Sequence, residues 1–312
     1  MPQRTRPLKP SVQLRQFEAT DGIGLPGLLY EPSRKTKRVA IFLHGNGDSS
    51  IFYSERVNVM AEEFNRRGIA FFPFNNRGAH LIRRLTRRVG GSRESVELGM
   101  TYELIRDCTH DINGAVRFLR TLGFEQFHLI GHSTGANKIV VYDYRRKRNP
   151  LSSYVLLAGG DDTGLYYESL GPRRFREALR KCRERVHAKE GHLLVTSKGY
   201  SPLIISWQSL LDTIDPEGDY NIFPFYESIN GLQLSEKQHF RELRAIRKPT
   251  LLLYGSEDEF CFGDVERCVG ILEDELSGKN NFEFITMKGA DHSFHGQVRE
   301  MASLVASWIA RQ

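Results

Sequence analysis

Apolar and polar residues alternate along this chain in two rhythms, one typical of strands and one typical of helices. Short apolar runs rich in β-branched and aromatic residues predict strands over 12–18, 24–30, 39–43, 69–74, 127–130, 153–158, 250–254 and 282–287. The first two runs are joined around Asp21-Gly22, and we expect them to form an antiparallel pair.

Between these runs, apolar residues recur every three or four positions, which predicts helices. The stretch 105–119 shows the pattern most clearly, with Ile105, Cys108, Ile112, Ala115, Val116 and Leu119 on one helical face. Helices are also predicted over 52–67, 136–144 and 298–308. Strands that alternate with helices predict an α/β fold with a mainly parallel central sheet and helices on both faces.

One long stretch, 161–248, interrupts this alternation, although a direct crossover between parallel strands needs far fewer residues. It holds a helical pattern (Phe175, Leu179, Cys182, Val186), a turn at 199–202 and many aromatic residues. We therefore divide the chain into a core over 1–160, an inserted cap over 161–248 and a second part of the core over 249–312. Most of the aromatic residues are expected to pack the cap itself, and Trp207 is the candidate for contact with a substrate.

Composition supports a folded chain without adding chemistry. The 312 residues are 40% hydrophobic with 19 Phe and 12 Tyr, which is ample for one large core. No apolar run approaches the ~18 residues that span a bilayer. The basic start, Met1 to Arg6, is followed by no apolar segment, so we expect no secretory signal and a cytoplasmic protein. The four cysteines show neither a C-x-x-C pair nor histidines at metal spacing, so we expect reduced thiols and neither metal nor cofactor.

The net charge of +6 raises the question of a nucleic-acid partner. Basic clusters lie at 83–84, 87–88, 145–148 and 173–176. The cluster 145–148 ends the predicted helix 136–144, where positive side chains complement the helix dipole. The other clusters are expected in loops or on helix surfaces, facing solvent. We therefore expect no nucleic-acid partner, with attraction of anionic substrates to a cleft mouth as the weaker alternative.

The segment Gly131-His132-Ser133-Thr134-Gly135 carries the first candidate chemistry, because it lies between the strand 127–130 and the helix 136–144. In that setting the two glycines permit a turn so sharp that the serine hydroxyl projects above the sheet edge. An ordinary Gly/Ser turn is the alternative, and the rest of the chain must decide. Ser133 is the candidate nucleophile.

Two further loops follow predicted strands, where a nucleophile at the strand ends needs partners. After 39–43 comes His44-Gly45-Asn46-Gly47, whose backbone can face a developing oxyanion. The N–H groups of Asn46 and Thr134 are the candidate donors. After 250–254 comes Gly255-Ser256-Glu257-Asp258-Glu259, in which we expect Asp258 to be the acid rather than Glu257, Glu259 or the later Asp264.

The candidate base follows the last predicted strand, in Asp291-His292-Ser293-Phe294-His295. His292 comes first after the turn and is free to reach both partners, whereas His295 is expected in or beside the first turn of the final helix. The resulting chain order Ser133, Asp258, His292 is that of an α/β-hydrolase triad.

With these motifs the chain resembles the α/β-hydrolase superfamily from about Phe17 to its C-terminus. The segment Phe72 to Gly78 resembles the strand and glycine turn that precede the elbow in these enzymes. The phrases LHGNGD, NNRG, GHSTGANK and GADHSFHG are most similar to a branch that contains fungal siderophore esterases and uncharacterised relatives. The resemblance implies the α/β-hydrolase fold and also places the base at His292.

The sequence thus favours a metal-independent serine hydrolase that cleaves a small-molecule carboxylic ester through an acyl-enzyme on Ser133. The same residues serve an amide, thioester or lactone equally well. A hydrolase-fold ligand-binding protein with little turnover is the alternative from another class. Acyl and alcohol preference, oligomeric state and pathway are beyond the sequence.

Overall fold

The computed structural model describes residues 11–46, 49–196 and 199–312. Met1 to Arg6 and Gly47, named above, lie outside the described residues. Eight strands form one sheet in the order β1-β2-β4-β3-β7-β8-β9-β10. They are β1 (Ser11–Glu18), β2 (Gly24–Glu31), β3 (Arg38–Leu43), β4 (Ala70–Phe74), β7 (Gln126–His132), β8 (Leu151–Leu157), β9 (Thr250–Gly255) and β10 (Phe282–Met287). This is the predicted mainly parallel sheet.

The six strands β4, β3, β7, β8, β9 and β10 pair parallel to one another, whereas β2 pairs antiparallel with both of its neighbours, β1 and β4. The central strands are buried almost throughout because helices cover both faces of the sheet. Parallel strands end at the same edge, which we call the carboxyl edge; it is where β3, β7, β9 and β10 end. The opposite edge, where β8, β9 and β10 begin, is called the amino edge.

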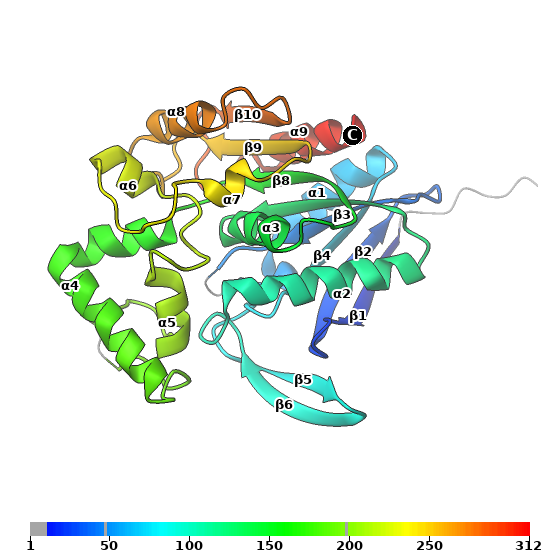
Figure 1. Ribbon diagram of the computed structural model, residues 1–312. Helices are drawn as coiled ribbons and strands as arrows, with labels where there is room; N and C mark the ends of the chain where they lie inside the picture. Colours follow the sequence, from blue (N-terminus) through cyan, green and yellow to red (C-terminus); the bar gives the residue numbers. More distant parts are fainter. Residues whose placement is uncertain (1–10, 47–48, 197–198) are drawn as a thin grey trace, which may run out of the picture.

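Helices cover the two faces unequally. On one face α1 (Glu55–Arg66) and α9 (Val298–Ala310) pack together and share one apolar cluster with the sheet. On the other face lie α2 (Cys108–Thr121), α3 (Thr134–Arg145) and α8 (Val265–Glu275), which share a larger cluster. The helices α1, α2, α8 and α9 each bury one apolar stripe, whereas α3 is buried on all sides from Thr134 to Asp143. Figure 1 shows α2 and α3 in front of the sheet.

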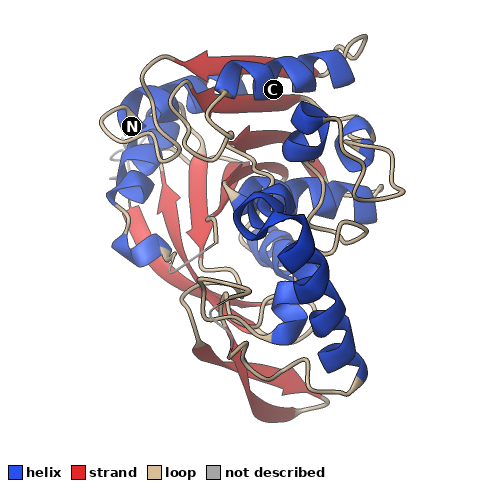
Figure 2. Cartoon of the chain, turned by 90° about the vertical axis from the view of Figure 1, so that its left-hand side faces the viewer, coloured by secondary structure: helices blue, strands red, loops and turns tan. Residues whose placement is uncertain are grey.

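The segment between β8 and β9 holds α4 (Asp162–His187), α5 (Trp207–Ile214), α6 (Phe225–Asn230) and α7 (Arg241–Arg244). The helices α4 and α5 pack against each other around an apolar cluster of their own. In α4 the backbone at Gly171 is non-helical, with φ 69°, just before Pro172. Figure 1 shows α4, α5 and α6 gathered beyond the arrowhead of β9, and Figure 2 looks onto that side of the molecule.

Two predicted helices begin differently from the prediction. The stretch 52–67 consists of a short 3-10 helix, η1 (Ile51–Tyr53), and α1, separated at Ser54. The Ser50 hydroxyl accepts a hydrogen bond from the Phe52 N–H and so caps η1 locally. The stretch 105–119 likewise begins as η2 (Ile105–Asp107) before α2.

An antiparallel hairpin of β5 (Arg83–Val89) and β6 (Ser92–Leu98), which was not predicted from the sequence, projects below the sheet in Figure 1. Gly90 and Gly91 form its two-residue turn, both at positive φ, which is the usual requirement of a tight hairpin. The prediction that the clusters 83–84 and 87–88 lie in loops or on helix surfaces is therefore wrong. The prediction for 173–176 is confirmed, because these arginines lie on α4.

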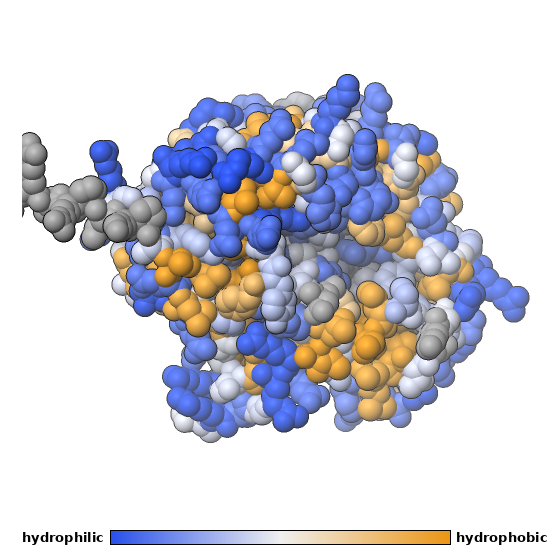
Figure 3. All heavy atoms as spheres, turned by 180° about the vertical axis from the view of Figure 1, so that it is seen from behind, coloured by the Kyte–Doolittle hydropathy of each residue, from blue (hydrophilic) through white to orange (hydrophobic). Residues whose placement is uncertain are grey.

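Seen from behind, hydrophilic side chains surround several separate apolar patches (Figure 3). Within the described ranges, no helix is long and apolar enough to cross a membrane.

Candidate active site

Ser133 occupies the sharp turn between β7 and α3. Its backbone has φ 57° and ψ −131°, a conformation that a residue with a side chain rarely adopts. Such a backbone costs on the order of 1–3 kcal/mol and persists only where its surroundings enforce it. Here they do, because a Cβ on Gly131 would lie 2.1 Å from the carbonyl oxygen of Gly135, and a Cβ on Gly135 would lie 2.4 Å from that of Leu43.

The loop after β3 lies directly against Ser133. A Cβ on Gly45 would be 2.8 Å from the Cβ and 3.3 Å from the Oγ of Ser133, so only glycine fits there. Asn46 continues this loop, and Thr134 is the first residue of α3. A helix leaves its first N–H groups without intrahelical partners and carries a partial positive charge at that end. Ser133 thus directly precedes one predicted N–H donor, Thr134, and contacts the residue before the other, Gly45.

Asp258 and His292 come together from the loops after β9 and β10. The Nδ1 atom of His292 lies 2.9 Å from Oδ1 and 3.0 Å from Oδ2 of Asp258. Both side chains are buried. Because a carboxylate only accepts, Nδ1 carries the proton that binds Asp258, which leaves Nε2 as the other ring nitrogen.

The other candidates for acid and base do not form this side-chain pair, although the Glu259 carboxylate accepts from the His292 backbone N–H at 3.1 Å. Glu257 and Glu259 are exposed, and Asp264 caps α8 by accepting from the Arg267 N–H. His295 precedes α9 rather than lying in its first turn, and its exposed ring bonds to Asp291 at 2.7 Å. Only His292 contacts Asp258 among these residues.

His132, the residue before the candidate nucleophile, ties the histidine loop to β7. Its Nε2 donates to the carbonyl oxygen of His292 at 2.8 Å. Burial holds the pKa of His132 well below its usual range, and nearby Arg56 adds to this. No hydrogen bond joins the Ser133 hydroxyl to the His292 ring in the described part of the chain, and such bonds are often long without substrate.

A second contact orients the loop of the predicted donor Asn46. The Nδ1 of His44 donates to the carbonyl oxygen of Gly45 at 2.8 Å, and its Nε2 accepts from the Asn76 N–H at 3.2 Å. This fixes a neutral tautomer, in agreement with burial, which lowers the pKa of His44 to about 3. The Gly45 carbonyl and the Asn46 N–H belong to one planar trans peptide and point in opposite directions. By fixing the Gly45 carbonyl, His44 therefore also fixes the direction of the Asn46 N–H.

Behind this loop lies a buried ion pair that the sequence analysis did not find. Lys138 of α3 and Glu103 are almost fully buried, and Nζ lies 2.7 Å from Oε1. Nζ also donates to Oδ1 of Asn76 at 3.2 Å. Burial raises the pKa of Glu103, while Lys138 opposes the rise. A Cβ on Gly78 would lie 1.9 Å from the Glu103 carboxylate, so the glycine of the NNRG phrase makes room for it.

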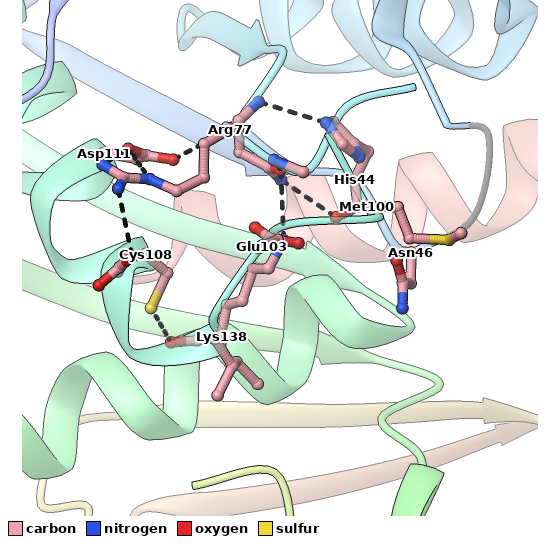
Figure 4. A network of polar contacts seen from close by, with 12 residues as sticks. His44, Asn46, Arg77, Met100, Glu103, Cys108, Asp111 and Lys138 are labelled. Carbon is pink, nitrogen blue, oxygen red and sulfur yellow. Dashed lines mark hydrogen bonds and ion pairs between the residues drawn. The ribbon is translucent and has the colours of Figure 1, made fainter. Parts of the chain in front are cut away.

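The same network continues to Arg77 (Figure 4). Its guanidinium donates to Asp111 at 2.7 and 3.0 Å and to Asp21 at 3.0 Å. Burial alone would lower the pKa of Arg77, but these carboxylates raise it overall. Figure 4 shows Lys138 and Glu103 between Arg77 and Asp111 on one side and His44 and Asn46 on the other. The phrases NNRG and GHSTGANK were the only sequence signal of this cluster.

Two further residues lie beside His292 without having been predicted. The ring of Phe260, 41% exposed, stands edge-on to His292 with 4.6 Å between the ring centres. Asp162 begins α4 and accepts from Asn137 Nδ2 at 3.3 Å. Burial raises the pKa of Asp162 to about 6, opposed by His292 and Lys138 nearby. Phe260 follows the acid loop directly, which is the one signal that the sequence offered.

Trp207 lies in the cap segment, away from the contacts of Ser133, Asp258 and His292 described above. It is 5% exposed and packs in the cluster of α4 and α5, with Tyr200 edge-on at 6.2 Å and the Arg185 guanidinium over its ring at 5.8 Å. Its contact with substrate stays a prediction. The four cysteines are buried and free. Over the described ranges, no three His, Cys, Asp or Glu side chains are grouped to hold a metal ion.

The fold and the residues at its carboxyl edge define the class of protein, an α/β hydrolase. Comparisons with known proteins agree. The model of the alpha/beta hydrolase family matches residues 40–304, which is most of the chain, and the protein therefore belongs to this family. No curated protein matches the chain in sequence.

Solved structures share the fold at low identity. Est1E from Butyrivibrio proteoclasticus, with ferulic acid bound, is 13% identical, with a TM-score of 0.59 over 96% of this chain and 99% of its own. The esterase Pf2001 of Pyrococcus furiosus is 16% identical, with a TM-score of 0.56 over 96% and 92%. The monoacylglycerol lipase of Paleococcus ferrophilus is 16% identical, with a TM-score of 0.56 over 96% and 99%. At this identity the likeness concerns the fold alone.

Proposed function

We propose that the protein is a serine hydrolase that cleaves a carboxylic ester through an acyl-enzyme on Ser133. The observation that carries the proposal is the strained backbone of Ser133 between the glycine loop of β3 and the first turn of α3. This strain has no evident structural use, and strain of this kind collects at active sites. The hydrogen-bonded Asp258–His292 pair at the same edge supports it.

The mechanism follows from these positions. Ser133 Oγ attacks the acyl carbon while Nε2 of His292 takes its proton, and Asp258 stabilises the imidazolium through Nδ1. The N–H groups of Asn46 and Thr134 receive the oxyanion. His292 then protonates the leaving alcohol. A water molecule, activated by the same ring, releases the acid and restores the serine.

The substrate side of the site is the segment 161–248, which we propose acts as a cap over the carboxyl edge. Two observations support this placement: its first helix begins beside the catalytic residues at Asp162, and α4, α5 and α6 lie beyond the strand ends in Figure 1. Phe260 offers an apolar wall next to His292. Bulky apolar or aromatic acyl groups are therefore expected to react better than acetate.

The substrate family is a narrower proposal. The four phrases resemble those of fungal siderophore esterases, and this resemblance makes a siderophore ester one compound for the test panel. Amides, thioesters and lactones belong in the same panel, because the triad serves them equally. A cytoplasmic location also remains a prediction.

The test is labelling with a fluorophosphonate probe, which reacts with an activated serine. Wild-type protein should be labelled, and Ser133→Ala should lose labelling and lower ester turnover by orders of magnitude. Ser256→Ala is the matched control, because Ser256 lies in the acid loop and only accepts from the Gly289 N–H. Unlabelled wild-type protein that binds esters without turnover would establish the ligand-binding alternative. Continued labelling of Ser133→Ala would remove Ser133 as the nucleophile.

A further inference from the structure

A cavity of about 550 Å³ opens at the amino edge of the sheet, where β8, β9 and β10 begin. It lies at the opposite end of the strands from Ser133. Three separate segments line it: the end of α3 with the loop that follows, the end of α7 with the residues before β9, and the residue Lys279 before β10.

Cations dominate this cavity. Six basic side chains line it, namely Lys147, Arg148, Arg244, Arg247, Lys248 and Lys279. Asp143 is the one carboxylate among the described lining residues. It is buried, and its Oδ1 already accepts from the Tyr154 hydroxyl at 2.7 Å and from Asn149 Nδ2 at 3.1 Å. The Asp143 carboxylate is therefore hydrogen-bonded to interior side chains and neutralises little of the positive charge in the cavity.

Most of these cations have no carboxylate partner among the residues that the structure describes. Arg244 pairs with Glu275, and Lys248 Nζ donates to the backbone carbonyls of Asn149 and Leu151. The other four, Lys147, Arg148, Arg247 and Lys279, have no carboxylate within 4.0 Å in the described ranges. Several like charges around one concave surface repel one another and create a local field that attracts anions.

The basic hairpin shows what an ordinary cationic surface looks like in the same protein. There Arg84 pairs with Glu97, Arg87 with Glu94 and Arg88 with Glu18. Three of the five hairpin arginines are thus matched across the strands or to a neighbouring strand, whereas Arg83 and Arg93 have no carboxylate within 4.0 Å in the described ranges. The amino-edge cavity differs because four unmatched cations line one hollow.

We propose that this cavity, the amino-edge pocket, binds a compact anion with several phosphate groups, such as a triphosphate chain. Guanidinium groups bind phosphate oxygens in pairs, and lysines add point charge. The volume falls within the range of small-molecule sites. A nucleic-acid strand requires cations spread along a stripe, whereas these converge on one depression from three segments. The site is separate from the proposed hydrolase chemistry.

Binding of inorganic tripolyphosphate, measured calorimetrically in 0.15 M NaCl, tests the proposal. At this salt concentration charges more than about 8 Å apart are largely screened. The pocket variant is Arg148→Gln with Arg247→Gln, and the matched control is Arg84→Gln with Arg88→Gln on the hairpin. Both remove two exposed positive charges, and neither residue of the pocket variant has a described carboxylate partner, so both variants should fold.

Wild-type protein and the hairpin variant should bind tripolyphosphate equally, and the pocket variant should bind at least tenfold more weakly. Equal losses in both variants, or no binding by wild-type protein, would overturn the proposal. A second experiment with ATP distinguishes the source of the phosphates. If ATP and tripolyphosphate bind with equal affinity, the pocket recognises the phosphate chain alone. If ATP binds more tightly and adenosine competes with it, the ligand is a nucleotide. Single-stranded RNA is the third ligand. If it binds more tightly than tripolyphosphate and ATP, and the pocket variant loses this binding, the proposal is overturned and the pocket is part of a nucleic-acid interface.

Discussion

Positive side chains have opposite environments at the two edges of the sheet. The helix α3 and the loop after it run from one edge to the other and carry basic residues at both. Near the carboxyl edge, Lys138 and Arg77 are buried and each contacts a carboxylate within 3 Å. At the amino edge, Lys147 and Arg148 are exposed and have no described carboxylate partner within 4.0 Å. In the sequence, nothing distinguishes the buried Lys138 and Arg77 from the exposed Lys147 and Arg148, because all four are simply basic residues.

The difference follows from the cost of removing a charge from water. That cost amounts to several kcal/mol for each buried ion, so a buried cation persists only with a close partner and further hydrogen bonds. An exposed cation keeps its hydration and needs no partner. Buried pairs therefore hold loops in fixed positions, while unpaired exposed cations remain free to bind a ligand.

The largest effect is expected from the acid at the carboxyl edge. Asp258→Asn should lower ester turnover by about 10⁴, because an amide no longer holds the required tautomer of His292. Glu259→Gln is the control, since its side chain accepts only from the His292 N–H. Steady-state kinetics of the two variants decide the matter, and a greater loss in Glu259→Gln would move the acid role to Glu259.

The buried Lys138–Glu103 pair allows the two edges of the sheet to be compared by measuring the free energy of unfolding. Lys138→Met leaves the Glu103 carboxylate buried without its cation and should lower the free energy of unfolding by about 3–5 kcal/mol. Lys147→Met, the same change at the amino edge, should stay within about 0.5 kcal/mol of wild type. Urea unfolding at pH 7 measures both. The comparison fails if the two variants lose similar amounts.

Adding Glu103→Leu to Lys138→Met separates pairing from packing. The double variant buries neither charge, and we expect it to recover much of the loss seen in Lys138→Met alone. No recovery would mean that the lysine contributes mainly through packing and its bond to Asn76.

His44→Asn tests whether this ring aims the Asn46 N–H. The asparagine amide can still donate to the Gly45 carbonyl, but the bond to Asn76 is lost. We expect turnover to fall roughly tenfold with little change in KM, less than the 10²–10³ lost with an oxyanion donor. An unchanged turnover, or an effect confined to KM, would contradict this positioning role.

The same variant gives a pH prediction. Burial lowers the pKa of His44 to about 3, so between pH 6.5 and that value the unfolded chain binds a proton that the native protein does not. Stability therefore falls as pH falls, by up to about 1.4 kcal/mol per pH unit for this group. His44→Asn should flatten the dependence of unfolding free energy on pH across this window. Parallel curves would exclude a neutral buried ring.

The smallest effect concerns the substrate wall. Phe260→Ala should raise KM several-fold for an aromatic acyl ester and much less for acetate, because the exposed ring stands beside His292. Trp207→Ala reports on the cap, where the ring packs among cap residues. If Trp207 also contacts substrate, its variant shows the same preference; equal effects on both esters restrict Trp207 to packing.

Local patterns sufficed for the elements that position the candidate site. The alternation of strands and helices, the glycines around Ser133 and the loops with Asp258 and His292 are all consecutive in sequence, and the structure has them at the predicted places. The hairpin of β5 and β6 was missed, although Gly90-Gly91 was a local turn signal, because its charged residues concealed the strand pattern.

The sequence by itself determined the order of elements and the residues that each strand end presents, because backbone sterics and hydrophobic periodicity act over a few residues. Only the tertiary structure decided which charges are buried and paired. Lys138 meets Glu103, Asn76 and, through the latter, His44 across three separate segments. The amino-edge pocket likewise takes cations from three separate segments, 147–148, 244–248 and Lys279. Burial and pairing depend on such distant contacts, and no short stretch of sequence encodes them.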